Sequence, residues 1–140
     1  MQWMWNGVVV NIPPEGSIGF VYRITNTIDG RVYIGKKNLF RTQIKRKVGK
    51  RPTRITKESD WREYWGSNKQ LLEDIDAHGE VNFHREVLHW CQTKGDASYL
   101  ELKQQILHGV LEHPTKYYNN FIGARIHRKH LKLDFMPDED

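Results

Sequence analysis

The run GFVYRITN at residues 19–26, followed by RVYIGKK at residues 31–37, decides the fold of this chain. Both runs are rich in β-branched and aromatic residues, which favour strands. An Asp-Gly pair at residues 29–30 lies between them. Two such runs around Asp-Gly predict an antiparallel β-hairpin.

The turn geometry sets which side chains meet. A two-residue turn at the Asp-Gly pair would place Tyr22 opposite Lys37. Because side chains alternate faces along a strand, Tyr22, Tyr33, Gly35 and Lys37 are then expected on one face. Two phenols, a lysine and a bare glycine would form a polar, accessible patch.

The rest of the chain predicts two helices and one further strand. Residues 67–70 have the spacing of a capping box, which predicts a helix that stops near Gly79. A strand is expected at about 81–90. A second helix is expected at about 97–112. Its apolar stripe would consist of Tyr99, Leu102, Ile106 and Val110.

Other segments are expected to lack regular structure. Residues 1–18 read as an irregular lead, and residues 134–140 as an acidic, frayed tail. Gly49 and Pro52 favour a loop over at least the second half of residues 38–57. The sequence therefore predicts one α+β domain, with a small, mostly antiparallel three-stranded sheet flanked by helices.

Length, cysteine content and hydropathy exclude several classes of protein. The 140 residues suffice for a single core. Cys91 is the one cysteine, so an intrachain disulfide and a CxxC zinc site are both excluded. The longest apolar run near the N-terminus, Val8–Val10, is far shorter than a membrane span. We therefore expect a cytoplasmic protein without membrane association.

Positive charge is concentrated in one segment. The chain has 22 basic and 17 acidic residues, for a net charge of +5. Residues 36–57 hold ten of the basic residues and no acidic residue, which leaves 12 − 17 = −5 elsewhere. Such a segment attracts polyanions by counterion release. The plainer interpretation is a solvated, flexible loop.

The paired runs resemble the signature of the GIY-YIG nucleases. Tyr33-Ile34-Gly35 matches the second triplet, and Tyr22 ends a first triplet that reads Phe-Val-Tyr. The resemblance spans about residues 19–132 and includes likeness to small phage-encoded members. It implies a DNA endonuclease that uses Mg²⁺ or Mn²⁺, in a homing, restriction or phage DNA-degrading role. Its compartment would be the cytoplasm of a bacterial host.

The resemblance also implies catalytic roles. Tyr22 or its neighbourhood would deprotonate the attacking water. Lys37, or Lys36 as a second candidate, would lower the pKa of its phenol or stabilise the phenolate. Tyr33 would orient the phosphate or the water. Glu101 would hold the metal ion. Asn119 would position the site or the DNA backbone.

The same family carries an arginine that would hold the non-bridging phosphate oxygens. Arg41 and Arg46 lie in about the right region, and Arg54 is a further alternative. The residues expected to bind double-stranded DNA are Lys36, Lys45, Lys47, Lys50, Arg51, Arg54, Arg125, Arg128 and Lys129. Because a monomer with one active site cuts one strand at a time, double-strand cleavage would imply a homodimer on DNA or sequential nicks.

Two other functions fit the sequence. One is a non-catalytic DNA-binding module on the same fold, and the other is a basic RNA-binding protein. Individual residues also have plainer interpretations. Glu101 could be a solvated helix residue, and Trp61, Tyr64 and Trp65 are better core anchors than base-stacking platforms. Metal-dependent cleavage would distinguish the enzyme from the binding modules.

Overall fold

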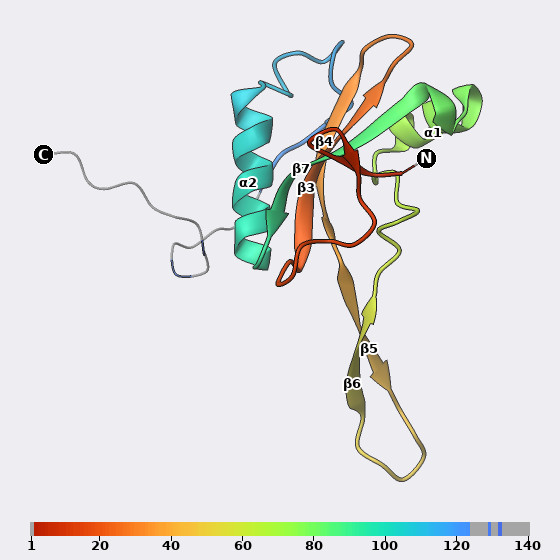
Figure 1. Cartoon of the computed structure of the whole chain (residues 1–140), viewed down its shortest axis with the longest axis vertical. Coiled ribbons are helices and arrows are strands. Elements are labelled where there is room, and N and C mark those ends of the chain that lie inside the picture. The colour runs from red at the N-terminus through yellow and green to blue at the C-terminus, as the bar shows by residue number, and fades with distance from the viewer. Residues whose placement is uncertain (1, 124–128, 130–131, 133–140) are drawn as a thin grey trace, which may run out of the picture.

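A five-stranded mixed sheet forms the centre of the protein, with its strands in the order β2-β1-β7-β3-β4 (Figure 1). The computed structural model describes residues 2–123, 129 and 132. The strands of this sheet are β1 (Met4–Trp5), β2 (Val8–Val9), β3 (Gly19–Asn26), β4 (Val32–Asn38) and β7 (Phe83–Cys91). The α+β class is confirmed. The predicted three-stranded sheet is wrong, because β1 and β2 extend it beyond β7.

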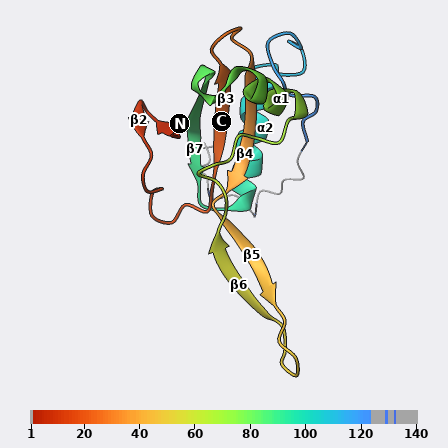
Figure 2. The ribbon, with the colours of Figure 1, turned by 90° about the vertical axis from the view of Figure 1, so that its right-hand side faces the viewer.

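Helices cover both faces of this sheet (Figures 1 and 2). Helix α1 spans Lys69–His78 and leads through a short 3-10 helix, Glu80–Asn82, into β7. Helix α2 spans Lys94–Leu107 and packs on the opposite face. Within the described residues, no helix is both long and apolar enough to cross a membrane.

The β3–β4 hairpin has a register two residues away from the predicted one. Tyr22 lies opposite Gly35, and Phe20 rather than Tyr22 lies opposite Lys37. Because the shift is an even number of residues, the alternation is unchanged. Tyr22, Tyr33, Gly35 and Lys37 therefore share one face, as predicted.

A longer turn causes the shift. Residues 27–30 form the loop, and the Asn26 N–H donates to the Arg31 carbonyl oxygen at 2.8 Å. The Asn26 carbonyl accepts from the Gly30 N–H at 2.8 Å. Gly30 adopts a left-handed φ of 80°, which glycine tolerates at no steric cost. The Asp-Gly pair thus ends the turn instead of forming all of it.

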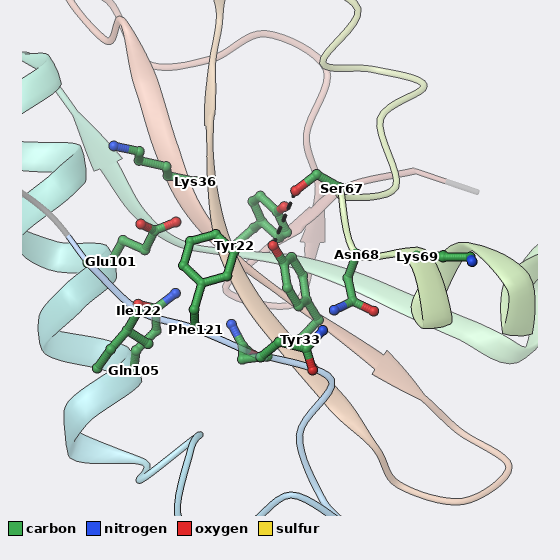
Figure 3. A pocket seen from close by; sticks show the side chains of 13 residues that line it. Tyr22, Tyr33, Lys36, Ser67, Asn68, Lys69, Glu101, Gln105, Phe121 and Ile122 are labelled. Atoms are coloured by element: carbon green, nitrogen blue, oxygen red, sulfur yellow. Dashed lines mark hydrogen bonds between the residues drawn. The ribbon is translucent and has the colours of Figure 1, made fainter.

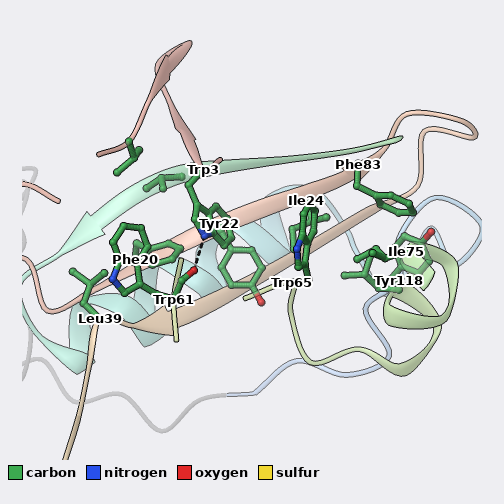
Figure 4. Packing of buried hydrophobic residues seen from close by; sticks show 13 residues of the cluster. Trp3, Phe20, Tyr22, Ile24, Leu39, Trp61, Trp65, Ile75, Phe83 and Tyr118 are labelled. Carbon is green, nitrogen blue, oxygen red and sulfur yellow. Dashed lines mark hydrogen bonds between the residues drawn. The ribbon is translucent and has the colours of Figure 1, made fainter. Parts of the chain in front are cut away.

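The N-terminal segment belongs to the core, which corrects the prediction of an irregular lead. Strand β1 pairs antiparallel with β2 and parallel with β7. Trp3 is 2% exposed and meets Phe20 and Tyr22 edge-on, with ring centroids 5.0 and 5.3 Å apart (Figure 4). Its Nε1 donates to the Trp61 carbonyl oxygen at 2.7 Å. Strands of two residues are too short to show an alternating pattern in sequence.

The basic segment forms a second hairpin, not the loop that was predicted. Strands β5 (Phe40–Lys45) and β6 (Thr53–Glu58) pair antiparallel and project away from the main sheet (Figures 1 and 2). Between Phe40 and Glu58 every residue is exposed except the half-buried Ile55. Because neither face is buried, the sequence carries no alternation of apolar and polar residues to reveal the strands. Only residues 46–52 form the connecting loop.

Asparagine and threonine cap the two helices at positions that differ from the predicted ones. Asn68, not Ser67, caps α1, since its Oδ1 accepts from the Leu71 N–H at 3.0 Å. Thr93 caps α2, since its Oγ1 accepts from the Asp96 N–H at 3.0 Å. The second helix therefore begins three residues earlier than predicted.

The predicted apolar stripe of the second helix is only partly correct. Val110 is buried and Leu102 half-buried, but Tyr99 and Ile106 are 38% and 60% exposed, whereas Ala97 and Gln105 are buried. The side-chain N–H of Gln105 donates to the Ile34 carbonyl oxygen at 3.1 Å, and Ala97 and Leu100 pack into the core beside it. The inward face of α2 therefore includes a polar residue that bonds to β4.

Truncation of Trp3 tests whether the N-terminal segment stabilises the core. We expect Trp3→Ala to lower the free energy of unfolding by about 3–5 kcal/mol, because it leaves a cavity and removes a buried hydrogen bond. Urea denaturation followed by circular dichroism measures this. Val8→Ala is the control, since Val8 is 67% exposed. Equal effects of the two changes would contradict the packing described here.

Candidate functional site

A pocket of about 400 Å³ opens at the outer edge of β4, the last strand of the main sheet (Figure 3). Side chains from both faces of the sheet reach it. Its lining residues are Tyr22, Tyr33, Lys36, Ser67, Asn68, Lys69, Glu101, Gln105, Asn119, Asn120, Phe121, Ile122 and Gly123. Tyr22, Tyr33, Glu101 and Asn119, predicted from distant parts of the sequence, therefore line one pocket.

Gly35 allows Tyr22 to reach this edge. A Cβ at Gly35 would lie 2.5 Å from the Tyr22 Oη and 2.7 Å from its Cζ. The phenol therefore occupies space that any other residue at this position would fill. The Tyr33 ring lies beside it at 6.1 Å between centroids, and the Tyr33 Oη is 3.3 Å from the Ser67 Oγ.

Asn119 forms hydrogen bonds with backbone groups at the open edge of β4. Its Oδ1 accepts from the Ile34 N–H at 3.2 Å, and its Nδ2 donates to the Ile34 carbonyl oxygen at 2.8 Å. The amide thus makes the two hydrogen bonds that a neighbouring strand would make. Asn119 is buried, so these bonds fix the wall of the pocket.

The segment that carries Asn119 is anchored through Tyr118. The Tyr118 hydroxyl donates to Asp74 Oδ2 at 2.6 Å and accepts from Asn26 Nδ2 at 3.1 Å. The Arg31 guanidinium lies 4.0 Å from the ring centroid. Helix α1, the first hairpin and the segment after α2 are therefore joined behind the pocket.

Glu101 reaches the pocket from α2 and is half-buried. Burial raises the pKa of its carboxyl, and this effect outweighs the opposing influence of the Lys36 charge and the Lys36 backbone N–H, which donates to it. The Lys36 Nζ lies 2.6 Å from the Ser98 Oγ. Glu101 is thus a carboxylate whose negative charge would be stabilised by a further cation.

The two tyrosines are held in their neutral form. Burial raises the pKa of Tyr22 well above its ordinary value, and the neighbouring Tyr64 and Tyr33 raise it further. Burial also raises the pKa of Tyr33. The Tyr64 ring lies 6.0 Å from that of Tyr22 and is half-buried. Trp61 and Trp65 are buried in the core, as predicted.

Lys37 lies on the same face as Tyr22 but outside the pocket. Its Nζ is 2.6 Å from Asp60 Oδ1 and 4.0 Å from the centroid of the Tyr64 ring. This ion pair lowers the pKa of the Asp60 carboxyl. Lys37 therefore contacts Tyr64, and Tyr64 contacts Tyr22.

The predicted arginines do not line the pocket. Arg41 lines a second hollow of about 660 Å³, together with Lys36, Lys37 and Lys94. Arg46 is exposed in the loop after β5. The other basic residues of the hairpin and its loop are exposed too, namely Lys45, Lys47, Lys50, Arg51, Arg54 and Lys57. Arg125 and Arg128 lie outside the described residues, and Lys129 is exposed.

Lys69 and Gln105 are pocket residues that the sequence analysis did not single out. Lys69 is the first residue of α1, directly after the Asn68 cap. The sequence signal was present, because the capping spacing marks the start of the first helix after the second triplet. The basic segment forms a hairpin between β4 and that helix, so the cation of the helix lies further along the chain than the predicted arginines.

The donor set of the pocket suits a metal ion that is shared with a substrate. Across residues 2–123, 129 and 132, no three His, Cys, Asp or Glu side chains cluster as a metal site. Among the described lining residues, Glu101 alone carries a carboxylate. Mg²⁺ commonly binds one or two carboxylates, several waters and the phosphates of the substrate. Glu101 therefore fits the part of such a site that the protein would supply.

A comparison with known families agrees with this arrangement. The family model of the segE GIY-YIG domain, whose description names an endonuclease, matches residues 3–122. No curated protein and no solved structure matches the chain. The matched range contains every described residue of the pocket except Gly123.

Replacing Gly35 tests the close approach of Tyr22. We expect Gly35→Ala to lower the free energy of unfolding by about 1–3 kcal/mol, because the new methyl group overlaps the Tyr22 ring. Urea denaturation measures the loss. Gly123→Ala is the control, since a Cβ there meets nothing within 4 Å. A neutral Gly35→Ala would show that Tyr22 does not lie across β4.

Proposed function

Because this chain belongs to the GIY-YIG endonuclease family, we propose that it is a metal-dependent DNA endonuclease that hydrolyses phosphodiester bonds at the β4 edge. One observation carries the proposal. Tyr22, Tyr33 and Glu101 come from separate elements and line one pocket, with Lys36 and Lys69 beside them. A pocket with phenols, one carboxylate and two lysines suits a phosphodiester better than an apolar ligand.

Tyr22 is the residue we assign to the attacking water. Its Oη is fixed above Gly35, and the buried ring leaves it little freedom to move. Since the phenol is neutral at rest, it must lose its proton before it can accept one from water. Tyr33, held near Ser67, orients the water or the phosphate. Lys37 acts on Tyr22 indirectly, because it packs against Tyr64, which contacts Tyr22.

Glu101 is the residue we assign to the metal ion. Burial raises the pKa of this carboxyl, so a bound cation would favour its charged form. When bound, Mg²⁺ or Mn²⁺ would neutralise charge on the phosphate and on the departing 3′ oxygen. Asn119 holds the pocket wall through Ile34 and is a positioning residue.

Lysines take the place of an arginine in the pocket on this proposal. Lys36 and Lys69 line it, whereas Arg41 lies in the adjacent hollow and Arg46 beyond it. A lysine offers a point charge and no bidentate fork, so it neutralises phosphate with less directional control. Arg41 would contact the DNA backbone beside the scissile phosphate, and Arg46 would contact it further along.

A non-catalytic DNA-binding module is the second candidate function. The absence of an arginine among the described lining residues favours it, as does the neutral Tyr22. A carboxylate in a pocket for phosphates opposes it, because pure binding gains nothing from that negative charge. Cleavage separates the two candidates.

The first test of the proposed function is plasmid cleavage. We expect supercoiled plasmid to be nicked or linearised with Mg²⁺, to stay intact with EDTA, and to be cut at least about 100-fold more slowly by Glu101→Gln. Agarose gels measure the rates. Glu15→Gln is the matched control, since Glu15 is exposed and does not line the pocket.

The outcomes discriminate between the candidates. Plasmid and phage DNA that are bound but uncut in Mg²⁺ and Mn²⁺ would favour the binding module. Neither binding nor cleavage would overturn both candidates. Equal cleavage by Glu101→Gln and the wild type would remove Glu101 from the mechanism.

The pH dependence of cleavage tests Tyr22. Because the pKa of Tyr22 is raised, its basic form grows about tenfold per pH unit between pH 7 and pH 9, and the rate should rise with it. The rate should also fall towards acid, since Glu101 has a raised pKa and loses its charge there. Single-turnover cleavage rates at saturating Mg²⁺ measure both the alkaline rise and the acid fall. If the cleavage rate of the Tyr22→Phe variant still rises with pH, another group causes the rise.

A further inference from the structure

We propose that the β5–β6 hairpin is a ribbon that enters the major groove of the duplex beside the cut site. This inference rests on the proposed function, since it concerns the same DNA. Strands β5 and β6 bury no face against the protein, and an isolated two-stranded ribbon is marginally stable in water. A ribbon kept exposed in this way has a surface free for a ligand.

The charge of the ribbon identifies the ligand as a polyanion. From Phe40 to Glu58 there are eight basic residues, and Glu58 is the one acidic residue. Arg41 lies directly opposite Lys57 in the ladder. Like charges in a cross-strand pair repel, so a phosphate between them would stabilise the ribbon.

The register assigns the charges to one face. Directly opposed residues share a face, so Arg41, Lys45 and Lys57 lie on the same face as Gln43, Thr53 and Ile55. Three cations, two hydrogen-bonding side chains and one half-buried isoleucine therefore form one surface with no acidic residue. The other face has Arg54 as its cation and ends at the acidic Glu58.

The cationic surface is continuous with the candidate active site. Lys36 lines both the catalytic pocket and the second hollow. Lys37, Arg41 and Lys94 line that hollow, Arg41 belongs to the ribbon, and the one acidic residue of the hollow, Asp60, is paired with Lys37. A DNA backbone bound at the pocket can therefore pass through the hollow onto the ribbon along a surface of net positive charge.

The size of the ribbon suits the major groove. Six residues per strand extend about 20 Å at roughly 3.3 Å per residue. That length corresponds to about six base pairs at roughly 3.4 Å each. A two-stranded β-ribbon fits the major groove of B-form DNA, whereas the deep, narrow groove of A-form RNA does not admit it.

The test compares two double variants of the full chain. Lys45→Gln/Lys57→Gln removes two cations from the ribbon surface and spares the hollow. Lys103→Gln/Lys116→Gln removes the same charge from exposed positions outside the ribbon. Binding to a duplex of about 21 base pairs, two helical turns, is measured by fluorescence anisotropy in EDTA over a range of salt concentrations.

We expect the ribbon variant to bind about 30-fold more weakly at 0.15 M salt and its slope of log K against log salt to be shallower by about 1.8. The control variant should keep the wild-type slope. Methylation of guanine N7, which lies in the major groove, should weaken wild-type binding more than it weakens binding of the ribbon variant.

Two results would overturn the inference. One is equal slopes for the two variants, and the other is equally tight binding of a duplex RNA of the same sequence. Because binding is measured without metal, it is independent of cleavage. A ribbon effect without cleavage of either plasmid or phage DNA in Mg²⁺ and Mn²⁺ would support the ribbon and favour the binding module over the nuclease. Cleavage without a ribbon effect would support the nuclease and overturn the ribbon inference.

Discussion

The outer edge of β4 is the constraint on which the site depends. Alternate N–H and C=O groups of an edge strand have no strand partner, and buried ones must be satisfied. Here the backbone of Val32 bonds to residues 116 and 118, Ile34 bonds to Asn119 and Gln105, and Lys36 donates to Glu101. A further strand would satisfy the same groups but would cover the pocket. Side-chain partners leave the edge accessible to a ligand.

The same burial gives the pocket its electrostatic character. Burial favours the neutral forms of Tyr22, Tyr33 and Glu101, because each would otherwise place a negative charge in a region of low polarity. Lys36 and Lys69 line the same pocket and add two positive charges to it. A further cation beside Lys36 would shift the protonation equilibrium of Glu101 towards its charged carboxylate. On the proposed function, the pocket would therefore bind a cation and a phosphate together better than either alone.

The sequence predicted the parts that local pattern determines. The hairpin with Tyr22 and Tyr33 follows from β-rich runs around a turn, and the resemblance supplied Glu101 and Asn119. The two-residue strands β1 and β2 could not be predicted, because their pairing depends on Trp3 packing against a core assembled from distant segments. The inward face of α2 was missed for a similar reason. That face includes the buried Gln105, whose hydrogen bond to β4 is not revealed by apolar periodicity.

The position of the β5–β6 hairpin explains why the expected arginine could not be assigned from spacing. The hairpin lies between the second triplet and α1, so Arg41 and Arg46 fall on an exposed ribbon while Lys69 begins the helix. On our proposal, the pocket and the ribbon therefore have different roles. Lysines in the pocket neutralise the phosphate without fixing its orientation, because an ammonium is a point charge. The ribbon then has to orient the DNA and its scissile phosphate. Weaker binding of DNA by the ribbon should therefore slow cleavage even when the pocket is intact.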